Sequence, residues 1–420
     1  MMILDYLLAY NRYACLIGII AIFGLTWLFS MGRRTINWWQ VLKAFLLQVG
    51  FGLLLLRVPF IESSILMPVS NAFNQLFHYA CIGSKFLFGN LIEPCDVWGS
   101  VFAFRVLPVI IFFAALSAIL YYFGIIQFVV YWLNRAIRPI LGTSGPETLS
   151  TTANIFLGQT EAPLLIKNYL AHLSRSEMFV IMVSGMAHIS AAIMAVYATM
   201  GVPMKHMLIA AVMAVPGSIL IAKMMLPEEK GRSGDASVTF EEQKGSFFGA
   251  LFQGTSAGVS LAVNVGAMLL VFLALLPLIN DLIGWLGVLL NYPLAYVGVV
   301  LPVLSLNYLF GLIFAPFAYL LGMTGSEAMM AGQILGSKVT LNEFIALQQM
   351  VQAHFSERAL ILLTYATAAF ANFSSIGIQV GGIGALVPER REWLTQLGMR
   401  AVLASSLVNL LSACIIGLML

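Results

Sequence analysis

Long apolar stretches recur through this chain of 420 residues and limit its possible folds more than any other feature. Several of them reach the roughly 18–20 residues that a helix needs to cross the hydrocarbon core of a bilayer. Only 9% of the residues are charged and 60% are hydrophobic, too little charge to cover the surface of a soluble protein of this length. The sequence therefore predicts an all-α polytopic membrane protein.

Hydropathy predicts eight transmembrane helices. They are expected at about residues 13–31, 41–61, 101–133, 177–199, 205–226, 249–285, 358–386 and 396–419.

The positions of Lys and Arg predict how these spans are oriented. Basic residues cluster in a few loops, which the positive-inside rule places in the cytoplasm. The first span then runs inward, and both termini are expected outside. The net charge of +3, without a basic tract, argues against a nucleic acid partner. The clusters are Arg33, Arg34 and Lys43; Arg135 and Arg138; Lys223, Lys230, Arg232 and Lys244; and Arg390, Arg391 and Arg400.

Two polar-interrupted segments do not fit a simple count of crossings. Residues 146–172 have basic residues on both sides, so the segment is expected to enter the membrane and return as a re-entrant hairpin. Residues 326–352 are interrupted in the same way and predict a second hairpin. The apolar stretch 295–322 is expected to lie along the outer interface.

The chain divides into four expected parts. Residues 1–100 hold N-terminal spans and an amphipathic segment, 101–226 a first repeat, 227–246 a cytoplasmic linker, and 247–420 a second repeat. Cys81 and Cys95 could pair if their segment faced an oxidising compartment, although isolated apolar cysteines are the favoured interpretation.

The two repeats share three short matches. "GTSGPE" at 142–147 returns as "GMTGSE" at 322–327, "AHLS" at 171–174 as "AHFS" at 353–356, and "AHIS" at 187–190 as "ANFS" at 371–374. An odd number of spans separates the two hairpins, so the repeats should be oppositely oriented in the membrane. Inverted repeats with broken helices are typical of secondary transporters.

Four polar clusters interrupt the apolar segments, two in each repeat. Because unpaired polar groups are costly in lipid, they are expected to converge on protein or water. Amides, hydroxyls and carboxylates suit a neutral polyhydroxylated or heterocyclic solute. A packing role for His188 and a role as ion ligand or proton carrier are equally open. The clusters are Asn154 with Gln159, Thr160 and Glu161; His188 with Ser190; Asn342 with Glu343; and Asn372 with Ser374 and Ser375.

Three motifs in this pattern resemble those of the concentrative nucleoside transporters. They are "GQTEAPLL" at 158–165, "NEF" at 342–344 and the long "FANFSSIGIQVGGIGALVPERR" at 370–391. The resemblance covers the chain from about residue 100. It implies eight spans with two opposed re-entrant hairpins, and a homotrimer of elevator-type protomers in the plasma membrane, here the bacterial inner membrane. Spans 101–133 and 249–285 would then form the scaffold and the trimer contact.

The resemblance also implies site residues, motif by motif. Gln159, Thr160 and Glu161 would bind the nucleobase, with Ile193 packing against it. Glu343, Asn372 and Ser375 would bind the ribose hydroxyls, and Phe370 would help to close the site. A cation site would use Asn154, the Leu157 carbonyl and the region of His188 and Ile189. A sodium-coupled member of the family has serine where His188 stands, so the coupling ion, sodium or proton, stays open at this point.

The resulting prediction is a secondary active symporter that imports nucleosides, driven by a sodium or proton gradient and without a cofactor. The alternative is a cation-coupled transporter of a related solute such as pseudouridine or a nucleobase. An enzyme is disfavoured because the sequence has no HExxH motif, nucleophile elbow or paired Asp motif.

Overall fold

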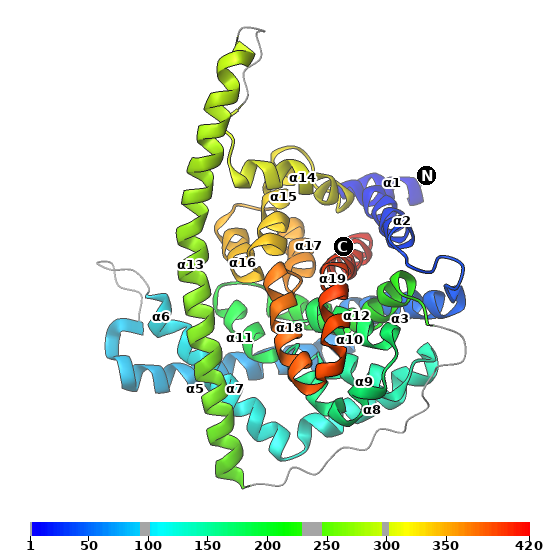
Figure 1. Ribbon diagram of the computed structural model, residues 1–420, viewed down its shortest axis with the longest axis vertical. Coiled ribbons are helices and arrows are strands. Elements are labelled where there is room, and N and C mark those ends of the chain that lie inside the picture. Colours follow the sequence, from blue (N-terminus) through cyan, green and yellow to red (C-terminus); the bar gives the residue numbers. More distant parts are fainter. Residues whose placement is uncertain (1, 93–100, 229–245, 296–301) are drawn as a thin grey trace.

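The computed structural model describes residues 2–92, 101–228, 246–295 and 302–420, which form helices and short connections without a strand (Figure 1). The N-terminal helices are α1 (Met2–Leu8), η1 (Ala9–Asn11), α2 (Arg12–Leu28), α3 (Trp38–Arg57), α4 (Pro59–Ile61), η2 (Glu62–Leu66), α5 (Met67–Phe88) and η3 (Gly89–Ile92). The first half continues with α6 (Phe102–Arg105), α7 (Leu107–Tyr122), α8 (Ile125–Leu141), α9 (Gly145–Ala153), η4 (Ala162–His172), α10 (Arg175–Ala187), α11 (Ala191–Thr199) and α12 (Met204–Met225).

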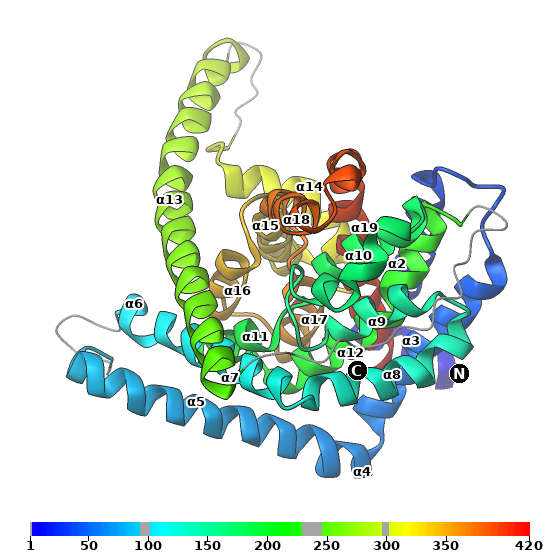
Figure 2. The same cartoon turned by 60° about the horizontal axis from the view of Figure 1, so that its bottom comes forward.

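The second half begins with one very long helix. It comprises α13 (Phe247–Ala295), α14 (Leu306–Leu320), α15 (Gly325–Thr340), α16 (Glu343–Gln352), α17 (Glu357–Thr367), α18 (Phe373–Leu386), η5 (Pro388–Arg390) and α19 (Arg391–Met419). Helix α13 runs along one side of the molecule, and one end stands clear of the body (Figures 1 and 2).

Seven helices among the described residues are long and apolar enough to cross a membrane, and the bent pair α14–α15 would make an eighth. The expected span 358–386 is not among the seven because it is split into α17 and α18, which lie on either side of residues 368–372. The molecule is a multi-pass membrane protein, whereas the number of crossings stays a prediction.

The prediction of a single span over residues 101–133 is wrong. Helix α7 ends at Tyr122, Gly124 adopts a left-handed conformation with φ of 75°, and α8 starts at Ile125 as a separate helix. Glycine adopts positive φ at little cost, so it ends the helix there. The apolar residues of α8 gather on one face, unlike those of α7, and hydropathy alone did not separate the two helices.

Both predicted hairpins are pairs of short helices, joined by eight residues in the first and by two in the second. In the first, α9 and η4 flank residues 154–161; in the second, α15 and α16 flank Leu341 and Asn342. We name these hairpin 1 (145–172) and hairpin 2 (325–352). The helix breaks predicted at His188 and Asn372 are confirmed, since α10 ends before the first and α18 begins after the second.

The matched repeat motifs adopt matching local structure. Gly142 and Gly322, which stand at the same place in the two repeats, both have positive φ, 63° and 84°. Ser174 and Ser356 each cap the N-terminus of the following helix with their side chains. The internal repeat inferred from short motifs is therefore matched in backbone geometry.

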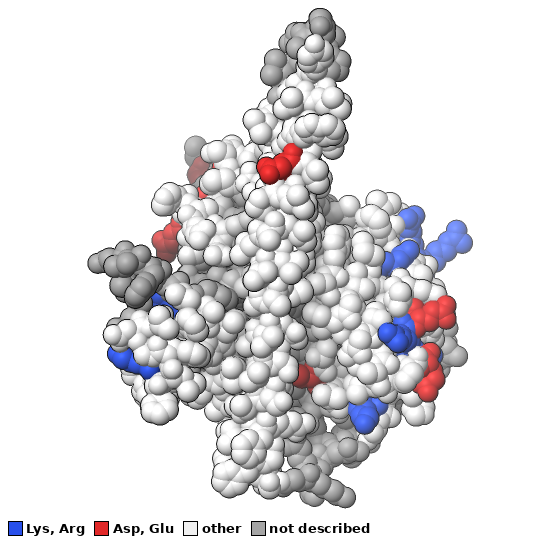
Figure 3. Space-filling view, turned by 60° about the vertical axis from the view of Figure 1, so that its left-hand side comes forward, with Lys and Arg blue, Asp and Glu red and all other residues white. Residues whose placement is uncertain are grey.

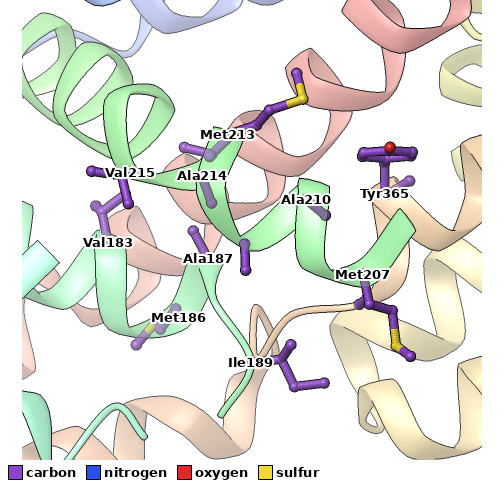
Figure 4. Packing of buried hydrophobic residues seen from close by; sticks show 14 of the residues in the cluster. Val183, Met186, Ala187, Ile189, Met207, Ala210, Met213, Ala214, Val215 and Tyr365 are labelled. Atoms are coloured by element: carbon purple, nitrogen blue, oxygen red, sulfur yellow. The ribbon is translucent and has the colours of Figure 1, made fainter. Parts of the chain in front are cut away.

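Three apolar candidate spans, made of four helices, form the packed interior. In α10–α11, α12 and α19, between 83% and 94% of the residues in the most apolar window are buried, against 11% in α13. Figure 4 shows Val183 of α10 beside Val215 of α12, and Ala187 of α10 near Ala214 of α12. Small side chains let the helix backbones approach closely. The face of α13 in Figure 3 is almost free of charge, as expected of a surface that meets lipid or another protein.

Three expectations fall wholly or partly outside the described residues. Residues 229–245 of the linker and 296–301 of the interfacial stretch lie there, and so does Cys95. Pairing of Cys81 with Cys95 therefore stays untested.

Candidate functional site

The carboxylate of Glu343 is the centre of a buried polar network. Its Oε1 accepts a hydrogen bond of 2.9 Å from the Tyr197 hydroxyl, and its Oε2 accepts one of 2.8 Å from Asn372 Nδ2. Glu343 is the first residue of α16, where the positive end of the helix dipole favours a carboxylate. Asn342 caps the same helix by accepting from the Ile345 backbone N–H at 2.9 Å. Hairpin 2 thus presents one acidic side chain at a fixed place.

Asn372 organises the break between α17 and α18. Its Oδ1 accepts from the Ser375 backbone N–H at 3.0 Å and from the Ser374 hydroxyl at 2.6 Å. The residue is therefore the N-cap of α18, and its Nδ2 donates a hydrogen bond to Glu343. One side chain both starts the helix and orients the carboxylate.

Gln159 brings hairpin 1 into the same network. Its Nε2 donates to the Ser375 hydroxyl at 3.3 Å, and its Oε1 accepts from Gln379 Nε2 at 3.2 Å. Gln379 also donates to the Met182 carbonyl at 3.0 Å, which ties the amide to α10. A Cβ on Gly185 would lie 2.7 Å from Gln379 Nε2 and 3.1 Å from Gln159 Cβ, so only glycine permits this approach. Side chains of α18 and of its N-cap thereby bind the tips of both hairpins.

The other predicted nucleobase residues make no hydrogen bond to this network among the described residues. The Glu161 side chain is exposed, and its Oε2 accepts from the Gly158 backbone N–H at 3.0 Å. Thr160 packs so closely on Gly382 that a Cβ there would lie 2.5 Å from its methyl group. Ile193 is buried on α11, one turn before Tyr197. The Phe370 backbone N–H donates to the His188 carbonyl at 3.3 Å, which joins the two helix breaks.

The predicted cation residues cluster at the first break. Asn154 is 1% exposed, its Nδ2 donates to the Ser184 hydroxyl at 2.9 Å, and its Oδ1 has no hydrogen-bond partner among the described residues. His188 Nδ1 lies 2.7 Å from the Ser184 carbonyl oxygen, so that nitrogen carries a proton and donates. Leu157 and Ile189 are buried. The set offers an unpartnered amide oxygen and a hydroxyl, which are ligand types of hard cations.

Sequence reasoning missed three members of this arrangement: Tyr197, Gln379 and Ser184. Gln379 could have been found, because a lone amide in an apolar span is costly unless it is bonded. Tyr197 and Ser184 carried no such signal, since aromatic and hydroxyl residues are common in membrane helices.

Comparisons with known proteins agree with this geometry. The family described as "Na+ dependent nucleoside transporter" matches at its C-terminal part over residues 206–417 and at its N-terminal part over residues 17–91. A segment described as "Nucleoside recognition" matches residues 103–204.

Relatives of known sequence or structure cover nearly the whole chain. An uncharacterized transporter of Haemophilus influenzae is 39% identical over 96% of both chains, and the nucleoside permease NupC of Helicobacter pylori is 37% identical over 96% of both. The sodium/nucleoside cotransporter 1 of Rattus norvegicus is 34% identical over 93% of this chain and 61% of its own length. The structure of CNTnw in an inward-facing substrate-bound state has a TM-score of 0.88 at 36% identity, covering 97% of this chain and 98% of that one.

These matches confirm the resemblance drawn from the three motifs, and they identify a transporter and not an enzyme. The chain belongs to the Na+-dependent, or concentrative, nucleoside transporter family.

Proposed function

We propose that this protein imports nucleosides by cation symport, binding each nucleoside between the tips of hairpins 1 and 2. The buried network that joins Gln159, Ser375, Asn372 and Glu343 is the observation that carries the proposal. It brings polar side chains from both halves of the chain to one place inside an apolar molecule. Polar groups in such surroundings are costly, so their presence there points to a function.

The unused hydrogen-bonding capacity of Glu343 fits a sugar. Each carboxylate oxygen accepts one hydrogen bond from protein, from Tyr197 or Asn372, and each has a second lone pair. Two neighbouring ribose hydroxyls are donors that match this pair of acceptors. Phe370, on the adjoining break, would close over the sugar, with Ser375 as a further hydroxyl partner.

The unused capacity of Gln159 fits a nucleobase. Its amide donates one hydrogen to Ser375 and accepts one from Gln379, which leaves one donor and one acceptor position. A base edge that presents an acceptor beside a donor complements this pair. Thr160 and Glu161 would extend the polar edge, and Ile193 would cover a face of the base.

Sodium is the coupling ion that the first break suits better. Asn154 Oδ1 and the Leu157 carbonyl offer oxygen atoms beside the break, and His188 and Ile189 complete its backbone. Since His188 Nδ1 donates to a carbonyl, this ring nitrogen does not serve as a cation ligand. Oxygen ligands match the preference of hard cations.

Alternating access would move the hairpin-bearing unit against a fixed scaffold in an elevator motion. Helices α7 and α13 supply the scaffold and the contact of a homotrimer, supported by the exposed, nearly uncharged face of α13. In this arrangement the hairpins are re-entrant, the repeats are inverted, and both termini lie outside the bacterial inner membrane. Residues 1–100 would belong to the scaffold side.

Uptake of labelled uridine into proteoliposomes tests the proposal. An inward sodium gradient should concentrate uridine inside, while a proton gradient alone should not. Uptake driven only by protons would overturn the sodium assignment, and the absence of any nucleoside uptake would overturn the function.

Competition tests the assignment of the sugar end. Free bases should compete poorly with uridine, because Glu343 would have no ribose to bind. A free base that competes as well as uridine, in wild type and in Glu343→Ala alike, would favour a nucleobase transporter instead.

A further inference from the structure

Lys338 is the buried cation of hairpin 2 and has no role in the site described above. It lies in the last turn of α15 and is 1% exposed. Its Nζ donates to the Ala366 carbonyl at 2.8 Å and to Asn409 Oδ1 at 2.9 Å. An ammonium group buried in a membrane protein is costly, so its ligands and its place call for a reason.

The hydrogen bonds of Lys338 reach both helix breaks. Ala366 lies in the last turn of α17, just before the second break. Asn409 of α19 accepts from Lys338 and donates its Nδ2 to the Ala187 carbonyl at 3.0 Å, and Ala187 is the last residue of α10. The positive group therefore lies among helix C-termini, whose dipoles favour a cation.

Counted from the hairpin tips, Lys338 has a counterpart in the first half, because Asn154 lies five residues before Gln159 and Lys338 lies five residues before Glu343. Gln159 and Glu343, at the two hairpin tips, are 184 residues apart, and so are His188 and Asn372 at the two breaks. The same separation relates Asn154 to Lys338. At this position hairpin 1 has the amide of the proposed cation site, and hairpin 2 has a positively charged lysine.

The two places differ in charge, because one holds a neutral amide and the other an ammonium group, but both contain buried oxygen atoms of similar chemistry. In hairpin 1 the Asn154 amide oxygen is buried and has no partner among the described residues. In hairpin 2 the Lys338 ammonium is bound by a main-chain carbonyl and an amide oxygen. Carbonyl and amide oxygens are the ligands that a small hard cation would take.

We propose that the Lys338 ammonium is a tethered cation, which occupies in the second half the place that the mobile coupling ion takes in the first half. It fixes α15 to both breaks and so positions Glu343, five residues further along, for the nucleoside. This inference rests on the proposed cation symport. As a consequence, one mobile cation suffices for each nucleoside, because the second place is permanently filled.

Variants of Lys338 test the proposal in the proteoliposome assay, with uridine uptake measured against sodium concentration. Wild type should show a Hill coefficient of about 1 for sodium. Lys338→Met should lower uptake at least about tenfold, because charge-assisted hydrogen bonds are lost. Lys338→Arg should keep most uptake, since the charge remains and a pocket of about 510 Å³ borders this residue.

Lys338→Asn is the decisive variant, because it places in hairpin 2 the amide that hairpin 1 carries. Uptake should recover only at raised sodium, with the Hill coefficient rising from about 1 toward 2. Ser337→Ala, at the buried neighbouring hydroxyl, is the matched control and should behave as wild type. A purely structural lysine would not change the sodium dependence.

A double variant guards against misfolding. Lys338→Met with Asn409→Leu replaces the polar pair by an apolar one, which buried sites often tolerate. The double variant should elute as a single species in detergent and yet transport poorly. Wild-type sodium dependence in Lys338→Asn, or wild-type uptake in Lys338→Met or in the double variant, overturns the inference. A wild-type protein without cation-driven uptake overturns the symport on which it rests.

Discussion

Each hairpin has a glutamate in the first turn of its first helix, which we call the base of the hairpin, and the two glutamates have different surroundings. Glu147 and Glu327 stand at matching positions of the repeat. Glu147 is 1% exposed, and its Oε1 lies 2.7 Å from Lys223 Nζ of α12. Glu327 is partly exposed and accepts from the Ser356 backbone N–H at 3.1 Å and from its hydroxyl at 2.8 Å. It borders an open pocket of about 570 Å³.

The difference indicates which hairpin is free to move. A buried ion pair fixes the base of hairpin 1, since separating it would leave an uncompensated charge inside the molecule. Hydrogen bonds at the surface exchange with water at little cost, so the base of hairpin 2 can open. We therefore expect the base of hairpin 2 to open more readily than the base of hairpin 1.

The largest expected effect concerns the tips, of which only hairpin 2 carries an acid in the network. Glu343→Gln should lower nucleoside uptake about 100-fold, because glutamine cannot accept from both Tyr197 and Asn372 and still bind ribose. Initial rates in proteoliposomes measure this. Glu327→Gln makes the same chemical change at the base and should leave uptake near wild type. Uptake of Glu343→Gln within threefold of wild type would contradict the site.

The ends of the two hairpins that carry Glu147 and Glu327 can be compared directly by the stability of variants. Glu147→Gln should lower the stability of the detergent-solubilised protein by about 2 kcal/mol, since among the described residues Lys223 then keeps Glu228 as its acidic partner. Glu327→Gln should cost less than about 1 kcal/mol, as surface interactions do. The temperature at which half of each variant loses monodispersity ranks the two losses against wild type. Equal losses in the two variants would remove the distinction between a fixed and a movable hairpin.

The hydrogen bond from Tyr197, in the first half, to Glu343 at the tip of hairpin 2 should matter less for uptake than the Glu343 carboxylate itself. Tyr197→Phe removes one hydrogen bond to a carboxylate and should lower uptake about tenfold. The loss should appear as a raised KM for purine and pyrimidine nucleosides alike, because the sugar end is common to both. A selective loss for one base class would place Tyr197 at the wrong end of the substrate.

The hydrogen bond from Gln379, in the second half, to Gln159 at the tip of hairpin 1 should have the smallest effect on uptake. Gln379→Leu leaves Gln159 free to rotate and should reduce uptake about threefold. Here the ratio of purine to pyrimidine uptake should change, since Gln159 would contact the nucleobase in the proposed binding mode. An unchanged ratio would argue that Gln379 supports packing only.

Much of the site could be predicted because its residues break local rules. Gln159, Glu343 and Asn372 are polar groups in apolar segments, and the cost of such groups in lipid marks them without a structure. The breaks at His188 and Asn372 were found in the same way. Tyr197 was not, because a tyrosine in an apolar helix breaks no rule until its hydroxyl is seen to contact Glu343.

The sequence by itself determined the membrane class, the two hairpins as helical pairs, the internal repeat and the family, since hydropathy and motif spacing are properties of the chain. Only the tertiary structure decided that α7 ends at Tyr122, that each hairpin tip is held from the opposite half, and that Lys338 reaches both breaks. These facts depend on one glycine conformation and on which groups meet across separations of 28 to 220 residues along the chain. Local composition cannot specify such meetings, because they arise from the packing of whole helices.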